Sequence, residues 1–303
     1  MFIDKIKAKI LGIKSNKKKC SFIQLNNDRQ TLKCNEKIIV SMTSWKKRIS
    51  MVVDVVNRLF KNTVVPDKII LNLSEDEFSN KEKDLPLELI ECEKNNDKFE
   101  IYWVKKNTKP YKKTIHTIRR FPNDVIITVD DDTVYPLNFI ETMLKYYNAY
   151  ERQCPITAGT YKWENNLFSH YGGFSLIKKE FVGDYLDDLY DNLVLNNLDD
   201  LPFADPVITY AVLLNGRRYR YTNSMNMSKV RQKTHNNSDA ISKLGTNEHR
   251  MQMEKEHALI REYILKKYNK TYEQLLDSKI IVNVTTYPAR DKNLYTALQS
   301  IST

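Results

Sequence analysis

The chain has 303 residues, a formal net charge of +10 and a hydrophobic content of 41%. That content is sufficient for a packed core, and 7 glycines and 9 prolines are too few for a collagen-like or low-complexity chain. No apolar run reaches the roughly 18–20 residues that a membrane-spanning helix needs. The four cysteines form no CxxC pair, so we expect no zinc knuckle, no disulfide framework and a reduced, cytoplasmic setting.

The positive charge has one concentration, near the N-terminus. Residues 1–20 contain seven lysines against one acid, Asp4, and their isoleucines recur with helical spacing. This pattern predicts a basic amphipathic helix that could lie on the inner face of the cytoplasmic membrane; the alternatives are a solvated tail and a helix packed on its own domain. Lysine outnumbers arginine 35 to 13, which argues against a nucleic-acid partner because base readout favours arginine.

From residue 37 the chain alternates strand-like and helix-like segments. The predicted strands are residues 37–42, 68–73, 99–104 and 124–129, the predicted helices are residues 50–61 and 114–121, and residues 79–97 are a charged stretch. Continuous apolar strands in repeated β-α-β units predict a parallel sheet covered on both faces. Ligands bind beyond the carboxyl ends of such strands, so the polar turns after the first two strands and the acids after the fourth should share one rim.

The second half of the chain is predicted to be less regular. It contains helices at residues 137–151, 205–215 and 247–275, irregular strands within residues 156–175 and a strand at residues 218–222. In the last helix, Ile260, Tyr263, Ile264 and Tyr268 share one face.

Three aspartates, Asp130, Asp131 and Asp132, follow the apolar fourth strand. Carboxylates this close repel one another unless a cation neutralises them. On an extended backbone Asp130 and Asp132 point the same way and Asp131 the other way. Such a pair suits a hard divalent ion that keeps open positions for a diphosphate. The alternative is an acidic turn exposed to water.

From residue 37 to about residue 221 the sequence resembles the metal-dependent glycosyltransferases of the GT-A fold, especially small bacterial transferases of capsule and lipooligosaccharide synthesis. The resemblance is carried by Ile38–Arg48, by Pro66–Leu71, by Tyr111-Lys112-Lys113 and by Phe121–Ile127, which leads into the DXD motif Asp130-Asp131-Asp132. It implies an α/β fold with a mostly parallel, Rossmann-like sheet flanked by helices, here with a C-terminal helical extension. It also implies transfer of a sugar from a nucleotide sugar, with UDP expected, to a hydroxyl of an oligosaccharide or lipid-linked glycan.

The resemblance implies roles for individual residues. Thr43, Ser44 and Arg48 would line the nucleotide pocket, Ser74 or Asp76 would close it, Lys113 would meet phosphate or base, and Asp130 and Asp131 would complete the donor site. Asp130 and Asp132 would hold Mn²⁺ or Mg²⁺ on the donor diphosphate, with His235 as the candidate third ligand. For Lys113 and His235, an ordinary surface position is the alternative.

Asp205 is the candidate general base. Inverting members of the family keep an acidic pair about ten residues before a glycine; Asp205 lies eleven residues before Gly216, but Ala204 replaces the usual Glu. The base would take the proton of the acceptor hydroxyl while the metal stabilises the departing diphosphate. The structural alternative is that Asp205 is an N-cap, followed by a proline in the first helical turn. Trp163 and His170 are weak acceptor-site candidates, and core packing is equally compatible with Trp163.

The C-terminal residues restart the pattern of the first strand. Residues 279–290 lie 242 positions after residues 37–48, and six of the twelve pairs are identical. We therefore expect a basic segment at 1–36, a GT-A domain at 37–222, a helical extension at 223–278 and, at 279–303, the start of a second GT-A-like domain of a bifunctional enzyme. Chance similarity between short apolar strands is the alternative.

Two other functions fit parts of the sequence. Asp130 and Asp132 after an apolar strand also match the first motif of haloacid dehalogenase-like phosphatases, in which the first Asp is the nucleophile. That family carries its motif on the first strand of the domain, whereas three predicted strands precede it here. The second alternative is a non-catalytic sugar-binding or scaffold module, favoured by Ala204 and opposed by the intact aspartate triplet.

Overall fold

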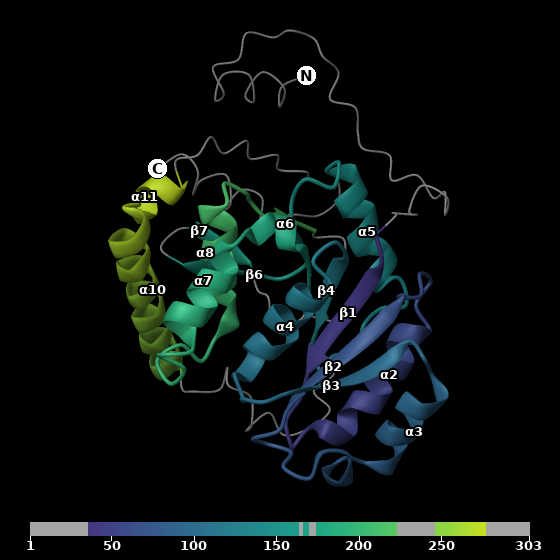
Figure 1. Ribbon diagram of the computed structural model, residues 1–303. Helices are drawn as coiled ribbons and strands as arrows, with labels where there is room; N and C mark the ends of the chain where they lie inside the picture. Colours follow the sequence, from purple (N-terminus) through teal and green to yellow (C-terminus); the bar gives the residue numbers. More distant parts are fainter. Residues whose placement is uncertain (1–35, 164–165, 170–173, 223–245, 277–303) are drawn as a thin grey trace, which may run out of the picture.

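The computed structural model describes residues 36–163, 166–169, 174–222 and 246–276 (Figure 1). Its main sheet has seven strands in the order β3-β2-β1-β4-β8-β5-β9. These are β1 (Ile38–Thr43), β2 (Lys68–Ser74), β3 (Phe99–Val104), β4 (Val125–Val129), β5 (Ile156–Thr157), β8 (Phe174–Ile177) and β9 (Arg220–Tyr221). A separate antiparallel pair consists of β6 (Thr160–Trp163) and β7 (Asn166–Ser169).

The first four strands are parallel, as the sequence predicts. β1 pairs with β2 and β4, and β2 pairs with β3. β8 runs antiparallel to β4 and to β5. The predicted fold class, a mostly parallel α/β sheet flanked by helices with a helical extension, is therefore confirmed.

The helices between and after these strands have the following bounds. They are η1 (Ile49–Met51), α2 (Val52–Phe60), η2 (Lys81–Asp84), α3 (Leu87–Asn95), η3 (Lys109–Tyr111), α4 (Lys112–Arg120), α5 (Phe139–Ala149), α6 (Lys179–Val182), α7 (Tyr185–Asp188), the π-helical turn η4 (Leu189–Val194), α8 (Ala204–Leu214), α10 (Thr246–Tyr268) and α11 (Tyr272–Leu276). None of the described helices is long and apolar enough to cross a membrane.

The core has two halves, one on each face of the sheet. In β1, Val40 and Met42 pack with α2, α3 and α5, whereas Ile39 packs with α4, α8 and α10 on the opposite face. This is the alternation that a strand buried on both sides imposes. α10 lies beside α8 at the edge of the molecule far from α2 and α3 (Figure 1), and its Ile260 and Ile264 are fully buried.

A buried polar network fastens α4 to the carboxyl ends of the strands. Ser41 Oγ donates to the Lys113 carbonyl at 2.5 Å and lies 2.6 Å from Thr117 Oγ1. Asn72 Nδ2 donates to Ser41 Oγ at 3.0 Å. Because these side chains are buried, their hydrogen bonds restrict α4 to one position over β1 and β2.

Three parts of the fold differ from the sequence-based expectation. The charged stretch 79–97 contains α3, and residues 178–194 contain α6, α7 and η4. The helix expected at 247–275 is divided into α10 and α11, with Asn269 between them at a φ of 52°. The predicted basic helix at residues 1–20 and the predicted second-domain start at 279–303 lie outside the described residues.

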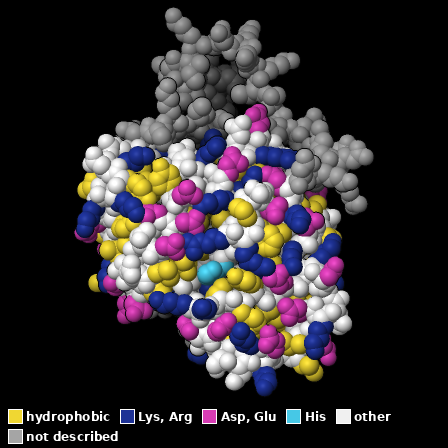
Figure 2. Space-filling view, in the orientation of Figure 1, with side chains coloured by type: hydrophobic (Ala, Val, Ile, Leu, Met, Phe, Trp, Pro, Cys, Tyr) yellow, Lys and Arg dark blue, Asp and Glu magenta, His cyan; other side chains and the backbone are white. Residues whose placement is uncertain are grey.

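Basic and acidic side chains are interspersed over the described part of the face in Figure 2. The net charge of +10 is thus not gathered into one basic patch on this face.

Candidate functional site

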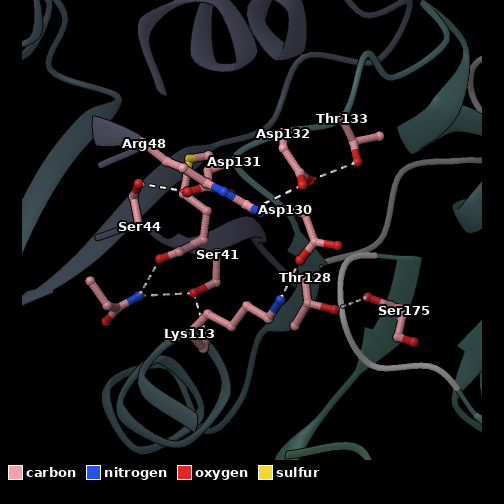
Figure 3. A network of polar contacts seen from close by, with 12 residues as sticks. Ser41, Ser44, Arg48, Lys113, Thr128, Asp130, Asp131, Asp132, Thr133 and Ser175 are labelled. Atoms are coloured by element: carbon pink, nitrogen blue, oxygen red, sulfur yellow. Dashed lines mark hydrogen bonds and ion pairs between the residues drawn. The ribbon is translucent and has the colours of Figure 1, made fainter. Parts of the chain in front are cut away.

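The three aspartates lie directly after β4 at the rim, and two cations from other elements contact them (Figure 3). Lys113 Nζ, in the first turn of α4, lies 2.6 Å from Asp130 Oδ1. Arg48, in the turn after β1, places one guanidinium nitrogen 2.9 Å from Asp132 Oδ2 and 3.3 Å from Asp131 Oδ1. The acids after the fourth strand and the polar turn after the first therefore meet, as the parallel topology predicts.

The side-chain directions differ from simple strand alternation. Asp131 and Asp132 share Arg48, whereas Asp130 pairs with Lys113. The physical reason is that β4 ends at Val129 and the next residues turn, so the two-residue repeat of a strand no longer applies.

Asp131 is the buried member of the triplet. Its residue is 6% exposed, and Ser44 Oγ donates to its Oδ2 at 2.6 Å. Burial raises the pKa of Asp131 to about 6, although Ser44 and Arg48 act in the opposite direction. Through its contacts with Ser44 and Arg48, Asp131 thus connects the turn after β4 to the turn after β1.

The two lysines that open α4 point to different strands. Lys113 reaches Asp130 after β4. Lys112 Nζ instead donates to Ser74 Oγ, at the end of β2, at 3.5 Å and to Asn107 Oδ1, in the segment after β3, at 2.8 Å. Burial lowers the pKa of Lys112, which is 2% exposed. Ser74, expected to close the nucleotide pocket, therefore faces Lys112 rather than the aspartates.

Thr43, the other expected nucleotide-pocket residue, lies at the last position of β1. Its hydroxyl donates to the Asn72 carbonyl at 2.8 Å. Asp76 accepts a hydrogen bond from the Asn107 backbone N–H at 3.0 Å, on the Lys112 side of the rim.

The donor set fits a divalent cation that is shared with a substrate. Mg²⁺ in proteins is typically held by one or two carboxylates together with substrate phosphates, and Asp130 and Asp132, each only partly buried, supply two. Within the described residues, no group of three His, Cys, Asp or Glu side chains forms a complete metal site. The third ligand expected, His235, lies outside those residues.

Asp205 lies on a different element, as the second residue of α8. Phe203 is the N-cap and makes no side-chain cap, so the alternative in which Asp205 is the N-cap is wrong. Pro206 does occupy the first turn, where its missing N–H has no cost. Both peptide groups that flank the N-cap residue are held: Tyr111 Oη donates to the Phe203 carbonyl at 2.7 Å, and the Phe203 N–H donates to Glu256 Oε1 at 3.1 Å.

Tyr111 connects the two groups of acids. It is fully buried, and burial, with Glu256 and Asp205 nearby, raises its pKa well above 10. Two residues later in the chain, Lys113 contacts Asp130. Asp205 and the aspartate triplet therefore border the same short segment, η3 and the start of α4.

Three expected site residues lie wholly or partly outside the described part of the chain. His170 and His235 lie outside the described residues. Trp163 ends β6, and its side chain is not described.

Two residues of the site carry no clear signal in the sequence. Lys112 belongs to the Tyr111-Lys112-Lys113 motif, but nothing in that motif says which lysine reaches the aspartates. Glu256 is one acid among many in a charged helix, 51 residues after Asp205, so only the tertiary packing of α10 on α8 reveals it.

No family model and no curated protein matches the chain. Among solved structures, it is similar to 4-diphosphocytidyl-2C-methyl-D-erythritol synthase from Anaerococcus prevotii, at 11% identity and a TM-score of 0.39 over 75% of this chain and 97% of that one. It is also similar to TarS of S. aureus, at 13% identity and a TM-score of 0.39 over 62% of this chain and 35% of that one. The bifunctional IspDF from Campylobacter jejuni follows at 10% identity and a TM-score of 0.38 over 64% of this chain and 52% of that one. These values are too low to bear on activity.

Proposed function

We propose that the chain is a metal-dependent glycosyltransferase that moves a sugar from a nucleotide sugar, with UDP the expected nucleotide, to a hydroxyl of a glycan in bacterial surface polysaccharide synthesis. The observation that carries the proposal is the cluster of charged side chains at the carboxyl ends of the parallel strands. Three aspartates at the end of a parallel strand meet Arg48 and Lys113, which together give carboxylates for a cation and cations for a diphosphate.

On the donor side, Asp130 and Asp132 would hold Mn²⁺ or Mg²⁺, which when bound neutralises charge on the departing diphosphate. Lys113 and Arg48 would exchange their carboxylate partners for phosphate oxygens, a geometry that guanidinium and ammonium groups favour. Ser44 keeps its hydrogen bond to Asp131 when Arg48 turns to the phosphate, so the turn after β1 stays beside the aspartates. Thr43, at the end of β1, would border the nucleotide, whereas Ser74 would act only behind it, through its contact with Lys112.

On the acceptor side, Asp205 would act as general base. The acceptor oxygen bonds to the anomeric carbon while the bond from that carbon to the diphosphate breaks, and the hydroxyl proton passes to the Asp205 carboxylate. Asp205 is only partly buried and sits in the first turn of a helix, where the dipole favours a carboxylate. Asp205 would therefore be accessible when the acceptor binds.

The phosphatase alternative has less support. It requires Asp130 as a free nucleophile on the first strand of its domain. In this fold, β1, β2 and β3 all precede β4, and Lys113 Nζ lies 2.6 Å from the Asp130 carboxylate.

A screen of UDP-glucose, UDP-galactose and UDP-N-acetylglucosamine with Mn²⁺, read by thermal stabilisation and UDP release, tests the proposal. A ligand at 100 times its Kd stabilises the fold by about 2.7 kcal/mol. Asp130→Asn and Asp132→Asn should each remove this stabilisation, whereas Asp97→Asn, an exposed aspartate before β3 at the other end of the strand, should not. Phosphomonoester hydrolysis lost in Asp130→Asn, with no nucleotide-sugar binding in the parent protein, would instead favour the phosphatase. No Mn²⁺-dependent UDP binding and no hydrolysis would favour the scaffold.

A further inference from the structure

We infer that Glu256, on the helical extension α10, is a positioning residue for Asp205: its carboxyl group fixes the first turn of α8, on which Asp205 is carried. The inference deepens the proposed function and rests on Asp205 as the general base. The extension would then be part of the catalytic apparatus rather than an appendage to it.

The first observation is the hydrogen bond to the helix N-cap. The Phe203 N–H donates to Glu256 Oε1 at 3.1 Å, and Phe203 has no side-chain cap of its own. Tyr111 holds the carbonyl of the same residue at 2.7 Å. Together the two bonds fix the backbone dihedral angles of Phe203. Asp205 is two residues farther along, so a change in these angles changes the direction of the Asp205 side chain.

The second observation is the burial of Glu256. Its side chain is 0% exposed, and its second oxygen, Oε2, is buried without a hydrogen-bond partner of good geometry among the described residues. An apolar side chain of similar volume would fill the space without leaving such an atom, so core packing alone does not explain a carboxyl group here.

The charged surroundings agree with a neutral carboxyl. Burial raises the pKa of Glu256 to about 9, and Asp205 acts in the same direction; the Phe203 N–H, the Gln252 side chain and Lys109 act against it. Tyr111, which also faces this group, is itself neutral because burial raises its pKa. At neutral pH, Asp205 is therefore not opposed by a second negative charge from Glu256, while Glu256 still accepts the hydrogen bond from the Phe203 N–H.

The attachment of α10 does not depend on Glu256 alone, which makes a selective experiment feasible. Ile260 and Ile264 are buried in the core that α8 shares. His257, 1% exposed, lies with Nδ1 3.1 Å from Tyr210 Oη in the middle of α8. His257→Gln thus perturbs the same helix pair away from the N-cap and is the matched control.

The kinetic experiment compares Glu256→Gln, Glu256→Leu and His257→Gln in the full chain, using the three UDP-sugars above with Mn²⁺. Glu256→Gln keeps a neutral acceptor for the Phe203 N–H and should retain most of kcat. Glu256→Leu should lower kcat about tenfold to a hundredfold, as expected for a displaced catalytic group, with the donor KM unchanged. His257→Gln should lower Tm and leave kcat unchanged. Wild-type kcat in Glu256→Leu, or a loss of kcat that follows Tm in both Glu256→Leu and His257→Gln, overturns the inference.

A second measurement needs no activity. Because the folded pKa of Glu256 is raised, the folded protein binds this proton more tightly than the unfolded chain, so its stability contribution is complete below about pH 4.5 and is lost as pH rises towards 9. Glu256→Gln does not titrate, so its Tm relative to wild type should increase from pH 5 to pH 9. A relative Tm that falls over this range would mean an ionised, paired Glu256 and would overturn the inference.

The two proposals fail in different ways. Normal turnover in Asp205→Asn would remove the general base and with it the proposed mechanism, whatever the Glu256 variants do. An inactive Asp205→Asn together with a fully active Glu256→Leu would remove only the positioning role.

Discussion

Lys113 Nζ lies 2.6 Å from Asp130 Oδ1, and the two side chains are only 5% and 23% exposed. The pair joins the first turn of α4 to the end of β4 through the side chains expected to meet the donor. The protein thus neutralises a candidate metal ligand with a cation of its own, and any divalent ion must compete with that cation.

Lys113→Met should test this competition. The substitution leaves the Asp130 carboxylate without its partner, and loss of one member of a buried ion pair costs about 3 kcal/mol of unfolding free energy. Mn²⁺ alone should then raise the Tm of Lys113→Met more than that of wild type, because the competing cation is gone. Lys98→Met, an exposed lysine before β3, is the control. Equal Mn²⁺ shifts in wild type and Lys113→Met would contradict the competition.

Arg48→Ala should destabilise the protein in a pH-dependent way. Asp131 is buried against Arg48, and its pKa is raised to about 6. At pH 8 the substitution leaves Asp131 as a buried charge for which, among the described residues, Ser44 is the one remaining hydrogen-bond donor. At pH 5 a proton neutralises Asp131, and Arg48 matters less. Urea unfolding at both pH values measures the difference, and Arg48→Lys, which keeps the charge, should lie between wild type and Arg48→Ala. A loss of stability that is the same at pH 5 and pH 8 would rule out this account.

Asp205→Asn should separate catalysis from binding. Loss of a general base typically lowers kcat by about 10²–10⁴-fold, while an amide of the same shape leaves the first turn of α8 intact. Stabilisation by UDP-sugar and Mn²⁺ should stay at the wild-type level, because the proposed donor contacts lie in the segments after β1 and β4 and on α4. Asp199→Asn, whose side chain is fully exposed before α8, serves as the control. Weakened donor binding with unchanged kcat would assign Asp205 to the donor site instead.

His257 should make the packing of α10 sensitive to acid. Burial lowers the pKa of His257 to about 3, so the folded protein holds it neutral while the unfolded chain protonates it near pH 6.5. Its stability contribution is therefore complete above pH 6.5 and is lost as pH falls towards 3. The stability advantage of wild type over His257→Gln should shrink from pH 7 to pH 4, as measured by urea unfolding. A constant difference would mean that His257 is not the titrating group. Burial also lowers the pKa of His116, to about 4, so this residue gives the same direction of pH dependence.

The sheet could be predicted because its strands are apolar almost without interruption. Val125–Val129 is buried at every position, and Lys68–Ser74 at all but the first. α3 was missed because its sequence is mostly Glu, Lys and Asn, and Leu89 is its one fully buried residue. Helices that cover an edge of the core need so few apolar positions that no periodic pattern stands out.

The candidate site was predictable only where backbone topology determines it. Parallel strands bring their carboxyl ends together, which is why the aspartates after β4 could be predicted to lie near the turn after β1. The partner of each aspartate depends on the turn after Val129. Side-chain directions in a turn follow no periodic pattern, so the sequence does not predict them. Glu256 is determined by how α10 crosses α8, a contact between residues 53 positions apart that no local pattern encodes.

Tyr111, Lys112 and Lys113 are consecutive, yet they contact α8, the end of β2 and the residue after β4 respectively. Three consecutive residues thus contact three separate parts of the molecule, and no residue lies between them in the sequence. Substitutions here remove one attachment at a time. Deleting one of the two lysines would instead shift the rest of α4 by one residue, a rotation of about 100°, so the attachment of the other lysine would be lost as well. The number of residues across the junction of η3 and α4 is therefore under a stricter constraint than the identity of any one of these side chains.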